Sequence, residues 1–369
     1  MAKKNVLICI PSYTFGGAET HSRYTALSIK KDSNYEVFFL AFGRNDGFEI
    51  ILQNDGFKTL HYKIKPLDTI NSLQKILEVF KLFLFLRAYQ FKYIFSGTKN
   101  ENLLMGLIWK ILGVKKFYWH QWGIDKNKNI GFIEKMVIKL KPNYVANSQA
   151  CLENISTRHN IKNKSSIQII HNTFKSELLS IEKKETSKIF TILMIANFFP
   201  EKDHKTLLRA IKIFETKYPD AEIKLEFLGV APGNSIAKDE SKALAFDLNI
   251  NTPIHFKGKT DNIIPFLKQA DIGILSTSSE GFSNSILEYM AAGIAVIATE
   301  IPSNLEALGE NNKEWLFPVG DEKKCFELIE KLYLNQNLRI ELGKNNRKYA
   351  QANYTFENYS KKILDLLID

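Results

Sequence analysis

FTILMIA (Phe190–Ala196) is the segment that decides the fold. It is followed by a helical pattern at residues 205–217 and by a second largely apolar run, IKLEFL, at Ile223–Leu228. Apolar runs with little alternation are typical of strands that are buried on both faces of a parallel sheet. A strand, a crossover helix and a second strand form the unit from which open parallel sheets are built.

The same alternation of short apolar runs and longer helical patterns extends through both halves of the chain. Helical patterns occur, for example, at residues 19–30, 101–112 and 284–292. The fold class is therefore predicted as α/β with two Rossmann-like, doubly wound parallel-sheet domains. Further strands are expected at residues 6–10, 35–41, 93–96, 116–120, 144–147 and 167–171, and at residues 254–257, 272–276, 295–299 and 315–317.

The length of 369 residues suits two cores of ordinary size. A polar and charged stretch that ends at Lys188 is predicted to separate them. We expect an N-terminal, acceptor-binding domain at residues 1–177, a linker at residues 178–188 and a nucleotide-sugar-binding domain at residues 189–350. Ligands of doubly wound sheets bind beyond the carboxyl ends of the strands, so the cleft between the domains is the expected site.

Charge is distributed unevenly along the chain. Residues 1–180 contain 26 Lys and Arg against 13 Asp and Glu, whereas residues 181–369 contain 24 against 27. A basic half favours an anionic partner such as lipid phosphates, a phosphorylated acceptor or nucleic acid. The three cysteines, Cys9, Cys151 and Cys325, are widely spaced and odd in number, which favours a reducing compartment over a disulfide framework.

No segment of the sequence is long and apolar enough to span a bilayer. The nearest candidate, Leu73–Tyr89, is interrupted by four charged residues. It is interpreted either as a buried amphipathic helix or as a helix whose apolar face touches lipid.

Two candidate motifs lie between an expected strand and an expected helix. FGGAET (Phe15–Thr20) places two glycines before a helix start, where backbone N–H groups can approach a phosphate; a plain turn is the alternative. SEGFSNSILE (Ser279–Glu288) places Glu280 in a loop and Glu288 in the following helix. The two carboxylates could accept hydrogen bonds from sugar and ribose hydroxyls, and a helix cap beside a solvated Glu is the alternative.

Two further motifs contain a candidate cation and a candidate histidine. ANFFPEKDH (Ala196–His204) offers Lys202 to neutralise a leaving diphosphate, although a helix-entry loop with solvated charges explains it equally well. YWHQWG (Tyr118–Gly123) places His120 at a strand end between two tryptophans, which commonly stack on sugars. The chain has no Asp-x-Asp metal clamp, and the P-loop and hydrolase-elbow patterns are incomplete or missing.

In their order along the chain, these four motifs resemble those of glycosyltransferase family 4, the retaining enzymes of GT-B fold. The resemblance covers nearly the whole chain and is strongest from Ala196 to Glu306. The landmarks in that part are Lys202, Leu228-Gly229, Phe256–Gly258, Ala270-Asp271, Glu280-Gly281, Glu288 and Ala292-Gly293. In the first half, Gly16–Glu19, His120, Asn147-Ser148 and Asn172 match more loosely.

The resemblance implies a role for each site residue. The expected catalytic residues are His120 beside the donor sugar, Lys202 on the diphosphate and Glu280 on the sugar hydroxyls. The expected donor-binding residues are Gly16 and Gly17 at the diphosphate, Gly258 and Lys259 near the base, Phe282, Ser283, Asn284 and Ser285 at sugar and phosphate oxygens, and Glu288 at the ribose. The last helix, near residues 356–367 within 351–369, is expected to cross back to the first domain.

One position departs from the family pattern. Asn197 stands five residues before Lys202, where the family usually has Arg. Asn can donate a hydrogen bond to the donor but has no charge. Stabilisation of the leaving diphosphate would then rest on Lys202, Gly17 and the helix ends.

The implied activity is transfer of a hexose-type sugar, with retention and without a metal or other cofactor, from a UDP- or GDP-sugar. The basic first half favours a lipid-linked glycan acceptor, as in bacterial cell-surface polysaccharide biosynthesis. The expected location is cytoplasmic and peripheral, on the anionic inner face of the cell membrane. Nucleic acid is not an expected partner, because the basic residues are mostly dispersed lysines. The alternatives are a sugar-nucleotide epimerase or phosphorylase of similar form, a donor-binding protein without turnover, and a nucleic-acid-binding protein.

Overall fold

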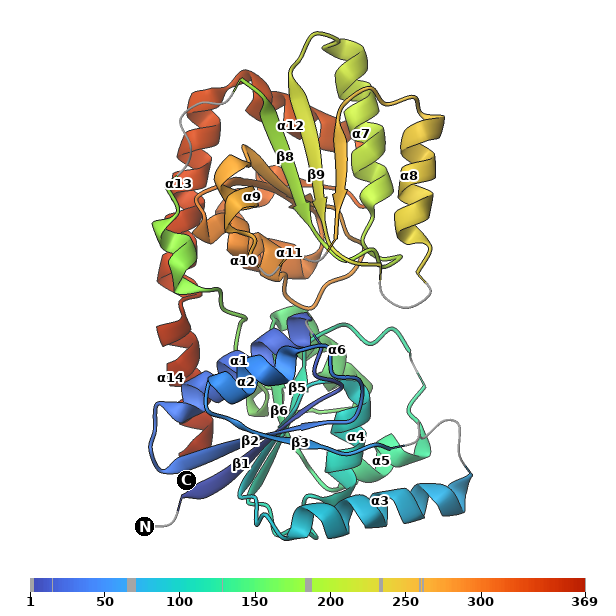
Figure 1. The fold of residues 1–369 in the computed structure, drawn as a ribbon, viewed down its shortest axis with the longest axis vertical. Helices are drawn as coiled ribbons and strands as arrows, with labels where there is room; N and C mark the ends of the chain where they lie inside the picture. Colours follow the sequence, from blue (N-terminus) through green and yellow to red (C-terminus); the bar gives the residue numbers. More distant parts are fainter. Residues whose placement is uncertain are drawn as a thin grey trace. The chain divides into compact units, whose positions relative to one another are not determined.

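The computed structural model describes residues 3–14, 16–64, 71–127, 129–182, 188–231, 235–258, 260 and 262–368. Contacts divide the chain into two compact units, each with its own sheet and core (Figure 1). The first unit comprises Met1–Asn172 with Glu357–Asp369, and the second comprises Thr173–Phe356.

The first unit is built on a seven-stranded sheet in which every recorded pair of strands is parallel. Its order, β3-β2-β1-β4-β5-β6-β7, reverses direction between β1 and β4. In a doubly wound sheet this reversal marks the crevice in which ligands bind. The strands are β1 (Lys4–Ile10), β2 (Tyr35–Ala41), β3 (Lys58–His61), β4 (Tyr93–Ser96), β5 (Lys116–Gln121), β6 (Asn143–Ala146) and β7 (Gln168–Ile169).

Helices cover both faces of this sheet (Figure 1). Leu82 and Leu86 of α3 pack with Leu104 of α4 onto Leu7 and Leu40 of the central strands. The helices are α1 (Gly17–Lys30), α2 (Phe48–Asn54), α3 (Ser72–Arg87), α4 (Lys99–Ile108), α5 (Phe132–Lys139), α6 (Gln149–Arg158), a 3-10 turn η1 (Lys164–Ser166) and α14 (Phe356–Leu367).

The C-terminal helix α14 packs within the first unit. The Tyr359 hydroxyl lies 2.8 Å from Thr25 Oγ1 of α1, and the hydroxyls of Tyr35 and Tyr93 donate to the Leu367 carbonyl at 3.3 and 3.2 Å. These bonds use carbonyls that the end of a helix leaves without intrahelical partners.

The second unit is built on a six-stranded parallel sheet of order β10-β9-β8-β11-β12-β13, which reverses between β8 and β11. The strands are β8 (Phe190–Ile195), β9 (Ile223–Leu228), β10 (Ile254–Lys257), β11 (Ile272–Leu275), β12 (Ala295–Thr299) and β13 (Leu316–Phe317). The helices are α7 (His204–Lys217), α8 (Ala237–Asp247), α9 (Ile264–Gln269), α10 (Asn284–Ala291), α11 (Pro302–Leu308), α12 (Glu322–Leu334) and α13 (Gln336–Asn353), with 3-10 turns η2 (Ser176–Ser180) and η3 (Glu310–Trp315). The predicted pair of doubly wound parallel sheets is confirmed.

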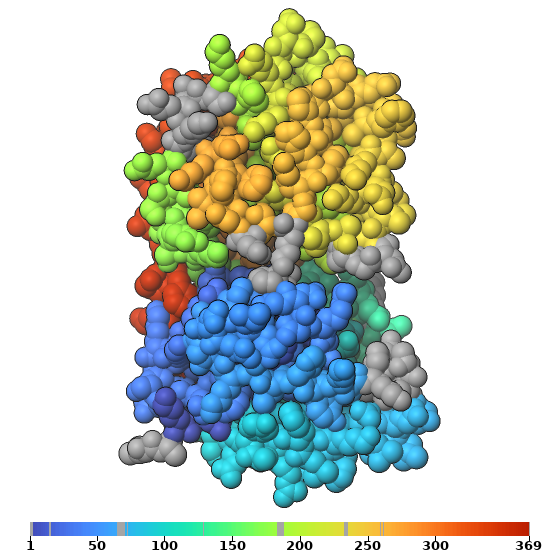
Figure 2. Space-filling model, in the orientation of Figure 1, coloured from blue at the N-terminus to red at the C-terminus, as the bar shows by residue number. Residues whose placement is uncertain are grey.

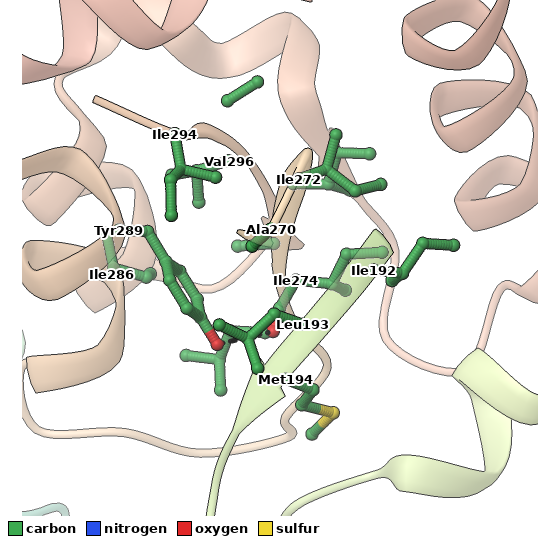
Figure 3. Packing of buried hydrophobic residues seen from close by; sticks show 14 of the residues in the cluster. Ile192, Leu193, Met194, Ala270, Ile272, Ile274, Ile286, Tyr289, Ile294 and Val296 are labelled. Carbon is green, nitrogen blue, oxygen red and sulfur yellow. Dashed lines mark hydrogen bonds between the residues drawn. The ribbon is translucent and has the colours of Figure 1, made fainter. Parts of the chain in front are cut away.

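Tyr289 fixes helix α10 onto the centre of the second sheet (Figure 3). Its ring packs against Gly273 of β11, where a Cβ atom would lie only 2.4 Å from the ring. Its hydroxyl accepts a hydrogen bond from the Ile195 backbone N–H at 2.6 Å. Glycine in β11 therefore leaves the space for the Tyr289 ring, which lets α10 pack on β11 and reach the end of β8 through the Tyr289 hydroxyl.

The first residues of the expected linker at 178–188 pack onto the second unit. Leu178 and Ile181 are buried in the core of the second unit. Their apolar side chains anchor η2 to that unit, so the described residues 173–182 are part of it. Residues 183–187 lie outside the described residues.

Among the described residues, the sequence prediction missed the edge strand β3. Its residues, KTLH, are half-buried or exposed, so the run has no apolar signature. Within the described part of the chain, no helix has both the length and the apolar content needed to cross a bilayer.

Candidate functional site

The carboxyl ends of β8 and β11 place two of the sequence motifs side by side in the second unit. The loop after β8 and the loop after β11 are joined by backbone bonds. Asp203 N–H donates to the Ser276 carbonyl at 3.0 Å, and Ser278 N–H donates to the Glu201 carbonyl at 2.8 Å. Because these loops flank the reversal in strand order, they occupy the position where doubly wound sheets bind ligands.

Lys202 and Glu280 form an ion pair across these two loops. Their side chains are only 15% and 17% exposed, so the pair is largely removed from solvent. The sequence predicted both residues as catalytic from separate motifs 78 positions apart. The structure brings them into direct contact within one unit.

The N-terminus of α10 adjoins Glu280 in sequence and carries four of the predicted donor-binding residues. The Ser283 hydroxyl caps the helix by accepting from Ile286 N–H, and it lies 3.0 Å from the Ser285 hydroxyl. Phe282 is buried edge-to-face against Tyr354, with ring centroids 5.4 Å apart. The first turn, which begins at Asn284, has N–H groups that no intrahelical carbonyl can satisfy, a geometry that favours anions.

Glu288 lies one turn further along α10. Burial raises the pKa of its carboxyl to about 7, and the positive charge of Lys175 opposes this shift. The carboxyl therefore changes its charge close to neutral pH, which the sequence did not indicate.

Asn197 is held by the backbone of the neighbouring loop. Its Oδ1 accepts from Val230 N–H at 3.1 Å. The loops approach closely because residue 229 is glycine, where a Cβ atom would lie 2.1 Å from the Ala196 carbonyl oxygen. The Asn197 side chain thus serves loop structure, at least through its oxygen.

Gly258 follows β10, and apart from its neighbours in the chain no atom of the described residues lies within 4 Å of where its Cβ would be. The open space at Gly258 would allow a ligand to approach the backbone closely. Lys259, which was paired with it in the sequence prediction, lies outside the described residues.

In the first unit, the glycine motif forms the start of α1. Gly16 is the N-cap residue and Gly17 begins the helix. A Cβ atom at Gly16 would lie 2.4 Å from Glu19 Oε2, so the glycine makes room for the Glu19 carboxylate at the helix start. Glu19 is buried, and burial raises the pKa of its carboxyl.

His120 lies at the end of β5 in an aromatic enclosure. Its ring packs edge-on against Phe95 and Trp122, with centroids 5.6 Å away in each case. Burial, assisted by the nearby imidazole of His21, lowers the pKa of His120 to about 3. Its buried Nε2 has no hydrogen-bond partner among the described residues. His120 is therefore a neutral imidazole at physiological pH.

Glu101, near the start of α4, was missed as a polar group at this end of the first sheet. It is 4% exposed, and its Oε2 has no partner among the described residues. Burial raises its pKa to about 7, and the carboxylate of Glu19 adds to the shift. From sequence alone, Glu101 resembled an ordinary acidic residue in the first turn of a helix.

Residues 176–349 match the family model described as Glycosyl transferases group 1. This range lies within the second unit and contains Lys202, Glu280 and Glu288.

Two curated relatives show the range of similarity. An uncharacterized glycosyltransferase of Methanocaldococcus jannaschii is 25% identical over 396 residues, covering 100% of both chains. The N-acetylgalactosamine-N,N'-diacetylbacillosaminyl-diphospho-undecaprenol 4-alpha-N-acetylgalactosaminyltransferase of Campylobacter jejuni is 26% identical over 58% of each chain. The chain thus spans the full length of the first relative and little more than half of the second.

Among solved structures, HepE of Anabaena in complex with UDP and glucose aligns with a TM-score of 0.83 over 98% of each chain, at 16% sequence identity. At this identity the likeness concerns the fold, which is GT-B, with two Rossmann-like parallel-sheet units. The chain thus has the GT-B fold, its residues 176–349 are similar to the group 1 glycosyl transferases, and both of these relatives are named as glycosyltransferases.

Proposed function

We propose that the chain is a retaining glycosyltransferase of family 4 that moves a hexose-type sugar from a UDP- or GDP-sugar to a lipid-linked glycan acceptor. The observation that carries the proposal is the second unit's ion pair between Lys202 and Glu280 beside the N-terminus of α10. A cation and a helix start at the reversal point of a parallel sheet together suit the diphosphate of a nucleotide-sugar.

Binding of the donor would separate this ion pair, because each of its members would gain a new partner on the donor. The Lys202 ammonium would leave Glu280 for the diphosphate and stabilise the negative charge that develops as the sugar bond breaks. The released Glu280 carboxylate would then accept hydrogen bonds from donor-sugar hydroxyls. Because Lys202 and α10 supply positive charge, we propose that transfer needs no metal ion.

We propose that Glu288 contacts the ribose, that Asn197 and Gly258 border the donor, and that His120, Gly16 and Gly17 of the first unit take part in the same reaction. A neutral His120 can donate or accept a hydrogen bond from a sugar hydroxyl without adding charge.

The relatives support the finer parts of the proposal. The name of the Campylobacter enzyme specifies a diphospho-undecaprenol acceptor, and HepE was solved with UDP and with glucose. We therefore propose a lipid-linked acceptor, a uridine nucleotide as the first donor to test, and a peripheral position on the cytoplasmic face of a bacterial membrane during cell-surface polysaccharide biosynthesis.

A thermal-shift screen of UDP- and GDP-sugars tests the donor directly, because a ligand that binds only the native state raises the melting temperature. The hit is then incubated with lipid-linked acceptors in the presence of a chelator, and the anomeric configuration of the product is determined by NMR. We expect one nucleotide series to stabilise the protein and an α-linked product from an α-linked donor. Stabilisation by neither series would contradict the proposal, and donor binding without product on any acceptor would favour a binding protein without turnover.

A further inference from the structure

Helix α3 presents apolar side chains to solvent on the face opposite the one it buries. Leu82 and Leu86 point into the core of the first unit and are fully buried. Five other large apolar residues of the same helix are between 43% and 67% exposed. These five, called the α3 stripe below, are Leu73, Ile76, Leu77, Phe80 and Leu84.

The α3 stripe has the spacing of one helix face. Its members are separated by three or four residues, apart from the adjacent pair at 76 and 77, so they form a continuous row about 17 Å long on one side of the helix. Figure 2 shows α3, in cyan, on the surface of the first unit. The helix has a regular capping box at Asn71, with reciprocal bonds to Gln74, so its start is well defined.

Further exposed apolar and basic residues occur in the elements that follow α3 along the chain. Helix α4 contacts both α3 and α5. Ile111, just after α4, is 65% exposed and follows Lys110, and Phe132 of α5 is 79% exposed on a helix that also carries Lys135 and Lys139. Arg87, in the last turn of α3, adds a cationic group to the helix that carries the α3 stripe.

We propose that the α3 stripe docks the first unit onto an anionic lipid surface. Apolar side chains would enter the boundary between headgroups and acyl chains, while lysines and Arg87 meet lipid phosphates. The excess of Lys and Arg in residues 1–180, 26 against 13 acidic residues, provides the matching long-range attraction. The inference deepens the proposed function by giving the enzyme a way to meet a lipid-linked acceptor.

A second copy of the chain fits this surface less well. The α3 stripe has five side chains, far fewer than the roughly 20–30 residues that each partner of a stable protein complex contributes. Neighbouring lysines would also face their counterparts across a symmetric interface.

Vesicle co-sedimentation tests the proposal with a matched pair of variants. The double variant Ile76→Ser/Phe80→Ser removes two members of the α3 stripe without adding charge. The control, Ile236→Ser/Phe246→Ser, makes the same changes at exposed positions of the second unit, which are 64% and 82% exposed. Vesicles contain phosphatidylglycerol and phosphatidylcholine, or phosphatidylcholine alone.

We expect the wild type and the control to bind anionic vesicles at low salt, and the Ile76→Ser/Phe80→Ser variant to bind at least about tenfold more weakly. Neutral vesicles and high salt should weaken binding of the wild type. Equal binding by the two double variants, or no binding of the wild type to anionic vesicles, would overturn the proposal.

A fluorophore at position 77 gives a readout that does not depend on removing residues. The three native cysteines are buried, so a Leu77→Cys variant can be labelled selectively with an environment-sensitive dye. The emission should shift to the blue only when anionic vesicles are added, and a Phe246→Cys label should not respond. A blue shift at position 77 without lipid, together with a dimer that Ile76→Ser/Phe80→Ser dissociates, would overturn the proposal in favour of an interface between copies.

Docking through α3 and binding of a nucleotide-sugar can be tested independently. Loss of vesicle binding should leave the donor-induced thermal shift unchanged, because the α3 stripe and the Lys202–Glu280 pair belong to different units. Conversely, a Lys202→Ala variant should bind vesicles like the wild type. A chain that binds vesicles through α3 but no nucleotide-sugar would retain the docking surface and contradict the proposed function.

Discussion

The two sheets differ in the polar groups at the carboxyl ends of their central strands: the second sheet has a charged pair there, and the first has groups that favour their neutral forms. At the reversal point of the second sheet, Lys202 and Glu280 form an ion pair that keeps some contact with solvent. At the corresponding end of the first sheet, the side chains of Glu101 and His120 are almost fully buried. Burial raises the pKa of Glu101 to about 7 and lowers the pKa of His120 to about 3, so both shifts favour neutral forms.

This difference assigns different chemistry to the same topological position. A charged pair beside a helix start can exchange partners with an ionic ligand, as a diphosphate requires. Buried groups that prefer to be neutral suit hydrogen bonding to hydroxyls instead. We therefore expect loss of the cation at the second sheet to have the largest effect on sugar transfer, and changes at the first sheet to have smaller effects.

The largest effect is expected from Lys202→Ala. Loss of the ammonium should lower the rate of sugar transfer by about 10²- to 10³-fold, because positive charge at the leaving group acts most strongly in the transition state. Initial rates at saturating donor measure this. The control is Lys205→Ala. Lys205 is an exposed lysine three residues further along the chain, and it pairs with Glu240 at 2.8 Å. Equal rates for the two variants would remove Lys202 from the mechanism.

A smaller effect is expected on the stability of the first unit. Because the pKa of Glu101 is raised in the folded chain, its stabilising contribution is present at low pH and is lost as the pH rises from about 4.5 through 7. Glu101→Gln removes this titration. Between pH 5 and pH 8, the free energy of unfolding of the variant should therefore fall by roughly 2 kcal/mol less than that of the wild type. Urea unfolding followed by tryptophan fluorescence is suitable, since three of the four tryptophans lie in this unit. An unchanged pH dependence would show that Glu101 is not the titrating group.

Donor affinity should show a weaker pH dependence through Glu288. Its pKa of about 7 means that the carboxylate form, which accepts hydrogen bonds best, is lost below neutrality. The dissociation constant of a nucleotide-sugar should rise several-fold from pH 8 to pH 6. The Glu288→Gln variant should show a flat profile. Parallel profiles for the two proteins, measured by calorimetry, would separate Glu288 from donor binding.

The smallest effect is expected in the pH profile of a His120 variant. With a pKa of about 3, His120 remains neutral throughout pH 5–8 and contributes no ionisation there. His120→Gln should lower the transfer rate while leaving the shape of the profile unchanged. A limb near pH 6 that disappears in His120→Gln would mean that this histidine titrates in the working enzyme.

The parallel strands were predictable because burial on both faces leaves an apolar run with few alternatives. Phe190–Ile195 and Ala295–Thr299 are almost entirely buried and were both recognised. Strand β3 was not, because Lys58–His61 lies at the sheet edge and half faces solvent. Leu178 and Ile181, which were expected in the linker, are buried in the second core, and the polar residues around them had concealed this burial.

Candidate site residues could be predicted from the sequence where a charged residue lies in a loop between an expected strand and an expected helix. Lys202 and Glu280 were proposed from different motifs, and only the fold revealed their contact. Glu101 was overlooked, because an acidic residue in a first helical turn is ordinary until its burial is known. Helix α3 was expected either to be buried or to touch lipid with its apolar face. The exposure of Ile76 and Phe80 favours the second interpretation.

The most direct test of the central claim is a crystal structure of the chain with UDP or GDP, whichever binds. The account predicts that the diphosphate lies within hydrogen-bonding distance of Lys202 Nζ and the first N–H groups of α10, and that the contact between Lys202 and Glu280 is broken. A nucleotide bound elsewhere, with that ion pair intact, would contradict the account.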